Sequence, residues 1–266
     1  MANEGKTAKG GAHPSMKPSP ELEHLFESIV MENQPISTVF QPVIALDDAQ
    51  MVGAEALSRG PKGPLSNPTL LFEMAEALGR SGMLDYVCVR RAVASHRIAA
   101  GKLFVNVLPT SLVTGPLTAE KLRAMAEEVA MEPEQVVLEV SEEAWQEDLR
   151  HPLLQILDQY RQKGFQIAID NVKAGQMSLD MMAAWRPDFL KVDIALIHGA
   201  RGHQARELLI ESLVYFADQV GSRIIAEGIE SQEDLDTMRR LGVGLGQGYL
   251  WGRPTASLTS VHKSSR

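Results

Sequence analysis

The sequence is poor in cysteine. Its 266 residues include one, Cys88, which excludes an intramolecular disulfide framework and metal sites built from several thiolates. Because Cys88 lies in an apolar pattern typical of a helix, we expect a buried free thiol. The seven histidines are scattered along the chain without the spacing of metal ligands. A site made of thiolates and imidazoles is therefore excluded.

Long apolar runs and an excess of basic residues are also missing. No uninterrupted apolar run approaches the roughly 20 residues of a membrane helix, and the N-terminus lacks the apolar core of a signal peptide. We therefore expect a cytoplasmic protein without a membrane partner. The chain has 26 basic and 34 acidic residues, which argues against a general DNA- or RNA-binding protein, since such proteins usually show a basic face.

The rest of the composition is that of an ordinary globular protein, with 44% hydrophobic and 23% charged residues. Residues 1–19 are rich in Gly, Pro, Ser and Lys, and we interpret them as a disordered tail. Residues 20–258 are expected to form one domain, because no boundary interrupts them. Residues 259–266 are expected to be a loose C-terminus.

Short β-like runs alternate with amphipathic helical patterns in this domain. The runs are STVFQPVIAL, MVGAEAL, KLFVNVLP, QVVLEVSE, FQIAID, DFLKVDIAL, RIIAEGI and VGLGQGYLW. The helical patterns cover residues 69–99 (split around 79–82), 119–131, 153–163, 178–185, 205–220 and 232–241. Such alternation indicates βαβ units with parallel strands, and eight units predict an α/β fold of the TIM-like (β/α)8 barrel type.

The first two runs break this pattern. Only DDAQ separates them, which is too short for a crossover helix and predicts a hairpin with one antiparallel strand. An open doubly wound sheet is the alternative fold. However, no G-x-G-x-x-G fingerprint follows the early strands.

Polar residues stand where the apolar strands end. They are Glu55, Asn106, Glu139, Asp170, Lys191, Asp193, Glu227 and Gln247, with Glu142 and Glu230 just beyond their strands. In a barrel the C-terminal ends of the strands open onto one face, so these side chains would converge there. Charged groups in a barrel mouth are costly unless they are paired or bind a metal, so a functional cluster is favoured over isolated surface residues.

The type of ligand indicates the chemistry. Carboxylate and amide oxygens select hard cations such as Mg²⁺, Mn²⁺ or Ca²⁺, and carboxylate-held Mg²⁺ most often acts on phosphate esters. Lys191 could hold the attacking water or stabilise charge on the phosphate. A Schiff-base lysine, as in an aldolase, is the rival interpretation. Neighbouring acids would keep this lysine charged, which disfavours imine formation.

The segment AEALSRG, with Glu55-Ala56-Leu57 followed by Arg59, resembles the signature of EAL domains, the bacterial phosphodiesterases that linearise cyclic di-GMP. Further segments resemble the family's strands in the family order: FQPVIAL, FVNVLPTSL, LEVSEE, DFLKVD, IIAEGIES and GLGQGYLWGRP. The matches extend from about Phe40 to Pro254, and they make an unrelated metal-dependent barrel a weaker interpretation. No segment resembles the cyclase, PAS or response-regulator domains that often precede EAL domains, so we expect a stand-alone EAL protein.

The resemblance implies roles for individual residues. The implied ligands of a first Mg²⁺ or Mn²⁺ are Glu55, Asn106, Glu139 and Asp170. Lys191 would position or help to activate the attacking water, and Glu227 would serve the second metal or act as a base. Asp193 and Gln247 would complete the network of water and metal. The implied substrate contacts are Gln41, Leu57, Arg59, Gln247 and Pro254, and the implied loop supports are Glu142 and Glu230.

One stretch departs from the family. Where the family usually has Asp-Asp-Phe-Gly-Thr-Gly-Tyr-Ser-Ser, this chain has DNVKAGQMS, so the second acid is Asn171 and the Phe-Gly pair is Val172-Lys173. An amide offers an oxygen without negative charge, so affinity for a second metal should fall. Two-metal catalysis would then slow.

Two functions follow from these features. The first is metal-dependent hydrolysis of cyclic di-GMP to linear pGpG, favoured by the intact first-metal set with Lys191 and Glu227. The second is a cyclic di-GMP receptor or protein-interaction scaffold with little or no turnover, favoured by Asn171 and the altered loop. Family members commonly dimerise near this loop, so the partners that the resemblance implies include a second copy or another protein.

Overall fold

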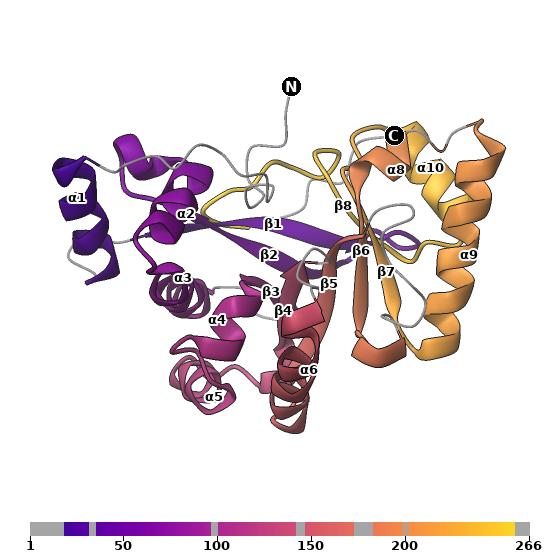
Figure 1. Ribbon diagram of the computed structural model, residues 1–266. Helices are drawn as coiled ribbons and strands as arrows, with labels where there is room; N and C mark the ends of the chain where they lie inside the picture. The colour runs from indigo at the N-terminus through magenta and orange to yellow at the C-terminus, as the bar shows by residue number, and fades with distance from the viewer. Residues whose placement is uncertain are drawn as a thin grey trace.

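The computed structural model describes residues 19–31, 36–96, 101–141, 147–172, 183–198, 200 and 202–258. The predicted tail, apart from Ser19, and the predicted loose C-terminus lie outside these residues, as does most of the helical pattern expected at 178–185. Eight strands form a closed barrel and follow one another around it in chain order (Figure 1). They are β1 (Ser37–Ala45), β2 (Met51–Arg59), β3 (Lys102–Val107), β4 (Val136–Ser141), β5 (Gln166–Val172), β6 (Phe189–Val192), β7 (Arg223–Glu227) and β8 (Leu245–Gln247).

The first strand runs against the others. β1 pairs antiparallel with both β2 and β8, whereas each later neighbouring pair is parallel. The turn between β1 and β2 is closed by Asp48, whose carboxylate accepts a hydrogen bond from the Gln50 N–H at 3.0 Å. Ala49 takes a positive φ of 59° in this turn. The predicted barrel and its antiparallel strand are therefore confirmed.

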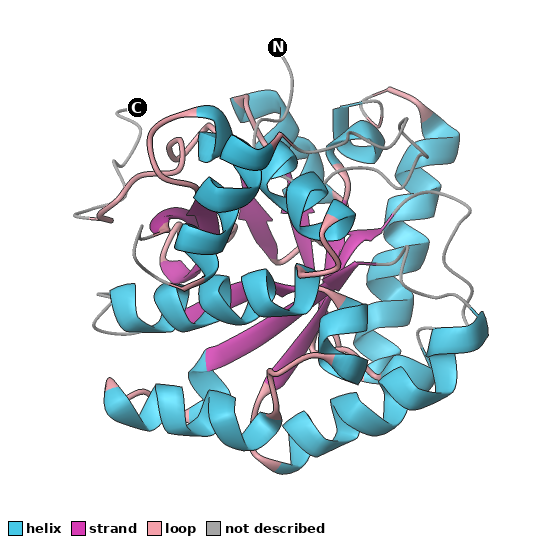
Figure 2. Ribbon diagram, turned by 60° about the vertical axis from the view of Figure 1, so that its left-hand side comes forward, coloured by secondary structure: helices cyan, strands magenta, loops and turns pink. Residues whose placement is uncertain are grey.

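Helices surround the barrel (Figure 2). The α-helices are α1 (Pro20–Val30), α2 (Pro68–Ala77), α3 (Ser81–Ser95), α4 (Pro109–Thr114), α5 (Ala119–Glu128), α6 (Glu147–Gln162), α8 (Ile194–His198), α9 (Gln204–Val220) and α10 (Gln232–Arg240). Two short 3-10 helices are η1 (Pro64–Ser66) and η2 (Pro133–Gln135). None of the described helices combines the length and the apolar character needed to cross a bilayer.

The helix ends show where sequence signals were sufficient. α10 begins at a capping box, in which Ser231 Oγ accepts from the Asp234 N–H and the Asp234 carboxylate accepts from the Ser231 N–H, both at 3.1 Å. α6 begins at Glu147, six residues before the pattern expected at 153–163. The sequence pattern did not predict these first turns because they are mostly polar and contain Pro152. The sequence pattern predicted neither α1 nor the short α4.

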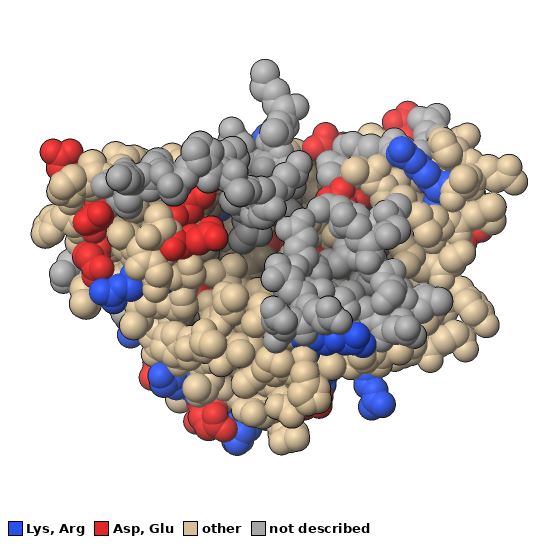
Figure 3. All heavy atoms as spheres, viewed as in Figure 1, with Lys and Arg blue, Asp and Glu red and all other residues tan. Residues whose placement is uncertain are grey.

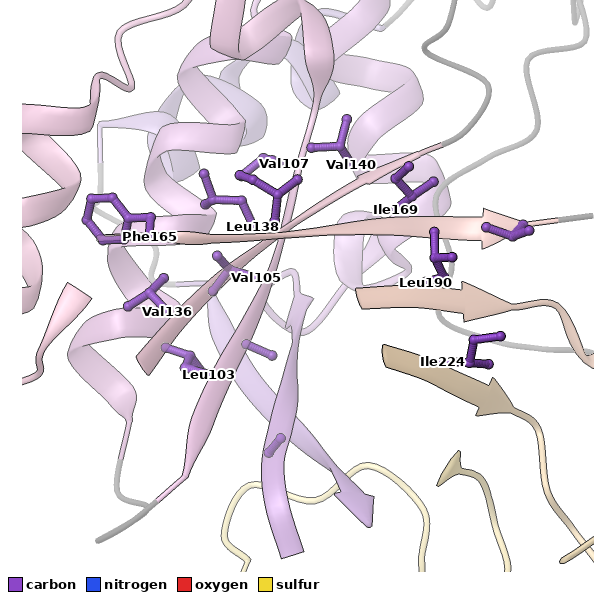
Figure 4. Packing of buried hydrophobic residues seen from close by; sticks show 14 of the residues in the cluster. Leu103, Val105, Val107, Val136, Leu138, Val140, Phe165, Ile169, Leu190 and Ile224 are labelled. Atoms are coloured by element: carbon purple, nitrogen blue, oxygen red, sulfur yellow. The ribbon is translucent and has the colours of Figure 1, made fainter. Parts of the chain in front are cut away.

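The core has two layers on either side of the strands. The outer layer lies between the strands and the helices, and Figure 4 shows part of it, including Leu138, Val105 and Leu190. The inner layer fills the barrel with Val43, Phe104, Val137, Ala168, Phe189, Ile225 and Leu245. Within it the rings of Phe104 and Phe189 pack edge to face, with centroids 5.2 Å apart.

The inner layer determines where the polar residues lie. On β3 to β8, each apolar residue of this layer stands two positions before a polar strand-end residue, as Phe104 does before Asn106. Because strand side chains alternate with a period of two, the polar set forms the next layer toward the C-terminal ends of the strands. On the face of the molecule in Figure 3, the basic side chains of the described residues are dispersed and form no continuous patch.

Candidate active site

The polar layer closes around one lysine. Lys191 on β6 is fully buried, and its Nζ lies 2.6 Å from Glu139 Oε1 on β4, 3.1 Å from Glu55 Oε2 on β2, 3.2 Å from Glu227 Oε1 on β7 and 3.6 Å from Asp170 Oδ1 on β5. These carboxylates come from positions up to 172 residues apart. The structure thus brings together four of the five acids that the strand-end pattern singled out.

Amide side chains orient one of the acids. Asn106 Nδ2 donates to Glu55 Oε1 at 2.9 Å, and Gln247 Nε2 donates to Glu55 Oε2 at 2.7 Å. Gln247 Nε2 also lies 3.2 Å from Gln41 Oε1 on the antiparallel strand, directly beside Glu55 in the β1–β2 register. Both oxygens of the Glu55 carboxylate are therefore held by hydrogen bonds.

Burial and mutual charge shift the protonation equilibria. Burial, together with the neighbouring Glu55 and Asp170 carboxylates, raises the pKa of Glu139 well above its usual range, although Lys191 opposes this. Burial alone would lower the pKa of Lys191, but the carboxylates around it raise that pKa well above its usual value. Lys191 therefore carries its proton at neutral pH, which supports the argument against a Schiff-base role.

Asn171 has an unusual backbone. The pairing of β5 with β6 shifts register between Ile169 and Val172, which places Asp170 and Asn171 in a bulge. Asn171 has a φ of 64°, in the left-handed region that Asn tolerates better than most residues with a side chain. The residue that departs from the family pattern thus stands at the one irregularity among the described parallel strand pairings.

The other predicted substrate contacts lie on β2 or beside β1. Leu57 is buried on β2. Arg59 ends β2 and donates to the Ser58 carbonyl at 2.9 Å. Pro254 precedes Thr255, whose backbone exchanges two hydrogen bonds with Phe40 on β1. This places Pro254 beside the strand that carries Gln41.

Three other predicted residues are not part of the described polar layer. β6 ends at Val192, so Asp193 follows the strand, and its carboxylate accepts from the Ala195 N–H at 2.6 Å at the start of α8. The expectation that Asp193 and Lys191 point to the same face of one strand therefore does not apply to Asp193. Glu230 is exposed, and its N–H donates to Asp234 at 3.4 Å. Glu142 lies outside the described residues. The roles expected for these residues stay predictions.

The donor set fits a hard divalent cation. It consists of carboxylate and amide oxygens, and Glu139 Oε2 is buried without a hydrogen-bond partner. Four carboxylates face one ammonium, so the cluster has an excess of negative charge when all are ionised. In the described part of the chain no group of three or more Asp, Glu, His or Cys side chains surrounds a common metal position, because these acids converge on Lys191 instead.

Asp85 is a buried acid that the strand-end pattern did not predict. This residue of α3 is almost fully buried, and its Oδ2 accepts a hydrogen bond from the Leu108 N–H at 3.2 Å, just after β3. The available signal was an acid within the apolar helical run MLDYVCV.

Comparison with known proteins relates this geometry to a family. The model of the EAL domain matches residues 23–254. The cyclic di-GMP phosphodiesterase RocR of Pseudomonas aeruginosa is 28% identical over 233 residues, which cover 84% of this chain and 58% of that protein. The probable cyclic di-GMP phosphodiesterase PdeB of Escherichia coli is 27% identical over 229 residues, which cover 84% of this chain and 43% of that protein. The chain spans about half the length of these relatives.

Solved structures share the architecture. The PaMucR phosphodiesterase in complex with c-di-GMP superimposes with a TM-score of 0.76 at 25% identity, covering 88% of this chain and 97% of that one. BlrP1 of Klebsiella pneumoniae in complex with calcium and cyclic di-GMP gives a TM-score of 0.75 at 26% identity, covering 84% and 56%. The matching family model and the shared barrel agree with the motifs read from the sequence. This chain belongs to the EAL domain family.

Proposed function

We propose that this chain hydrolyses one phosphodiester bond of cyclic di-GMP to give linear pGpG in bacterial second-messenger signalling, with Mg²⁺ or Mn²⁺ as cofactor. The observation that supports this function best is the buried Lys191 ammonium with carboxylates from four strands within 3.6 Å. The similarity to named cyclic di-GMP phosphodiesterases supports the same reaction. BlrP1 has been solved with calcium and with manganese, which supports a divalent cofactor.

Different residues would bind the cations and the substrate. A first cation would be held by Glu55, Asn106, Glu139 and Asp170. A second would be held by Asn171 and Asp193, with Glu227 either as a further ligand of this ion or as the base. Such ions, when bound, lower the pKa of a coordinated water and neutralise phosphate oxygens. The substrate contacts would come from Gln41, Leu57, Arg59, Gln247 and Pro254.

Proton transfer is assigned to the lysine and one acid. Lys191 keeps its proton and donates a hydrogen bond to the attacking water or to a phosphate oxygen. In the role of base, Glu227, whose Oε1 is 3.2 Å from Lys191 Nζ, accepts the proton that the water loses. The water oxygen bonds to phosphorus while one P–O ester bond breaks. The proton passes to the leaving sugar oxygen, so that one water is consumed and pGpG is released.

The test is incubation of the pure protein with cyclic di-GMP and Mn²⁺, followed by chromatography of the products. We expect pGpG from the wild type and none from Lys191→Ala. The matched control is Lys102→Ala, because Lys102 begins β3 at the opposite end of the barrel, where it donates to the Glu134 carbonyl. Absence of pGpG from the wild type after long incubation contradicts the proposal.

A second candidate function is a cyclic di-GMP receptor or scaffold with little turnover. The observation in its favour is Asn171, an amide in a bulge where the family carries an acid. It predicts that calorimetry detects binding of cyclic di-GMP while no pGpG forms. Turnover that Lys191→Ala abolishes would exclude it. The expected homodimer and protein partner stay predictions on either function.

A further inference from the structure

Asp85 lies outside the polar layer, yet its contacts lead back to it. The carboxylate is on α3, and its hydrogen bond from the Leu108 N–H attaches α3 to the segment that leaves β3. Asn106 lies two residues before Leu108 on β3 and donates to Glu55, whose other oxygen contacts Lys191. A short covalent and hydrogen-bonded path therefore joins a buried acid behind the barrel to the catalytic lysine.

The backbone at Leu108 depends on this acid. The next residue, Pro109, has no N–H and restricts Leu108 to extended conformations, and Leu108 has φ −78° and ψ 130°. The partly buried Leu108 N–H needs an acceptor, and Asp85 supplies it. We propose that Asp85 is a positioning residue: its carboxylate anchors Leu108 and so fixes the end of β3 that carries Asn106.

The surroundings of Asp85 make the anchor sensitive to pH. Burial raises the pKa of Asp85 to about 7, while the hydrogen bond from Leu108 and the side chain of Ser111 on α4 oppose the rise. The titratable groups that face it are Cys88, one turn further along α3, and Tyr160 on α6. No basic side chain within the described ranges forms an ion pair with Asp85.

Ionisation changes the strength of the anchor. A charged acceptor forms a hydrogen bond about twice as strong as a neutral one. The Leu108 anchor is therefore tighter above about pH 7 and weaker below it. The positioning of Asn106 should follow the same midpoint. The kinetic consequence rests on the proposed phosphodiesterase function, whereas the structural consequence does not.

The experiment therefore records both. Amide nitrogen–proton spectra of the metal-free protein are measured across a pH series, with attention to the Leu108 backbone and the Asn106 side-chain amide. We expect both signals to shift with a shared midpoint near pH 7 in the wild type, to lack that midpoint in Asp85→Asn, and to keep it in Cys88→Ala, a matched change one turn away. The titration of the wild-type protein tests the proposal even where a variant fails to fold. An Asn106 signal that is insensitive to this midpoint overturns the proposal.

Kinetics provide the second readout. For Asp85→Asn we expect kcat for cyclic di-GMP to fall about fivefold relative to wild type near pH 8, the factor for one ordinary hydrogen bond, and to approach wild type near pH 6, with KM unchanged. A ratio that is constant over pH contradicts the positioning role. If the wild type shows no hydrolysis while the Asn106 signal titrates as expected, the proposed function fails and the positioning inference stands.

Discussion

Replacement of Lys191 by methionine tests the electrostatics of the barrel mouth. Methionine has a similar length but no charge, so the Lys191→Met variant leaves four buried carboxylates without the ammonium that lies within 3.6 Å of each. Removing one partner of a buried ion pair typically costs about 3–5 kcal/mol, because the remaining charge is desolvated and uncompensated. Since the free energy of unfolding of natural proteins is about 5–15 kcal/mol, the variant should lose a large part of its stability.

The size of this loss depends on pH. Glu139 already has a raised pKa because of burial and the neighbouring Glu55, and without Lys191 it should hold a proton more readily. Protonation relieves part of the repulsion, so we expect the full loss of about 3–5 kcal/mol near pH 8 and a smaller one near pH 6.

The assay is urea unfolding followed by circular dichroism, first with a chelator and then with Mn²⁺. A cation that binds only the folded state adds about 2.7 kcal/mol at 100 times its dissociation constant. We expect Mn²⁺ to restore more stability to Lys191→Met than to wild type, because the ion replaces the missing positive charge. Lys102→Met, at the start of β3 and the opposite end of the barrel, serves as the control and should change stability by less than about 1 kcal/mol. A loss below about 1 kcal/mol for Lys191→Met near pH 8 would refute the reasoning.

Other predictions concern single residues. Asn171→Asp should raise turnover and lower the Mg²⁺ requirement if the amide limits binding of a second ion, and unchanged Mg²⁺ titrations would contradict this. Gln247→Leu removes the donor to Glu55 Oε2 and should lower kcat about fivefold or more in the same product assay, with the fold intact by circular dichroism. The pKa of Asp85 rises from 3.8 to about 7 on folding, so the unfolded state loses this proton at a lower pH than the folded state does. The free energy of unfolding therefore falls by about 4 kcal/mol as the pH rises from 3.8 to about 7. Asp85→Asn should lack this fall in urea titrations across pH, and an identical profile would count against a buried neutral acid.

Much of the site could be predicted from the strand-end pattern. Glu55, Glu139, Asp170, Lys191 and Glu227 each stand near the end of an apolar run, so a barrel prediction already places them on the face onto which the C-terminal strand ends open. The structure confirms that four of these side chains surround the fifth. The prediction succeeded because a strand side chain's direction depends on local alternation and on the apolar layer beneath it.

Other features could not be predicted in this way. The bulge at Asp170 and Asn171 depends on how β5 pairs with β6, strands separated by a long connection. Asp193 follows β6 instead of lying on it, because the strand ends at Val192, one residue earlier than strict alternation requires. Local patterns do not report where pairing between distant segments stops.

By itself, the sequence determined the barrel class, the family and the set of acids at the strand ends, because periodicity and motif spacing are local properties of the chain. Only the tertiary structure decided that these acids converge on a buried Lys191 ammonium. It also decided that Asp85 on α3 supports β3 through the Leu108 N–H. Those contacts join residues from different elements, and their energies depend on burial and on distances that exist only once the barrel has closed.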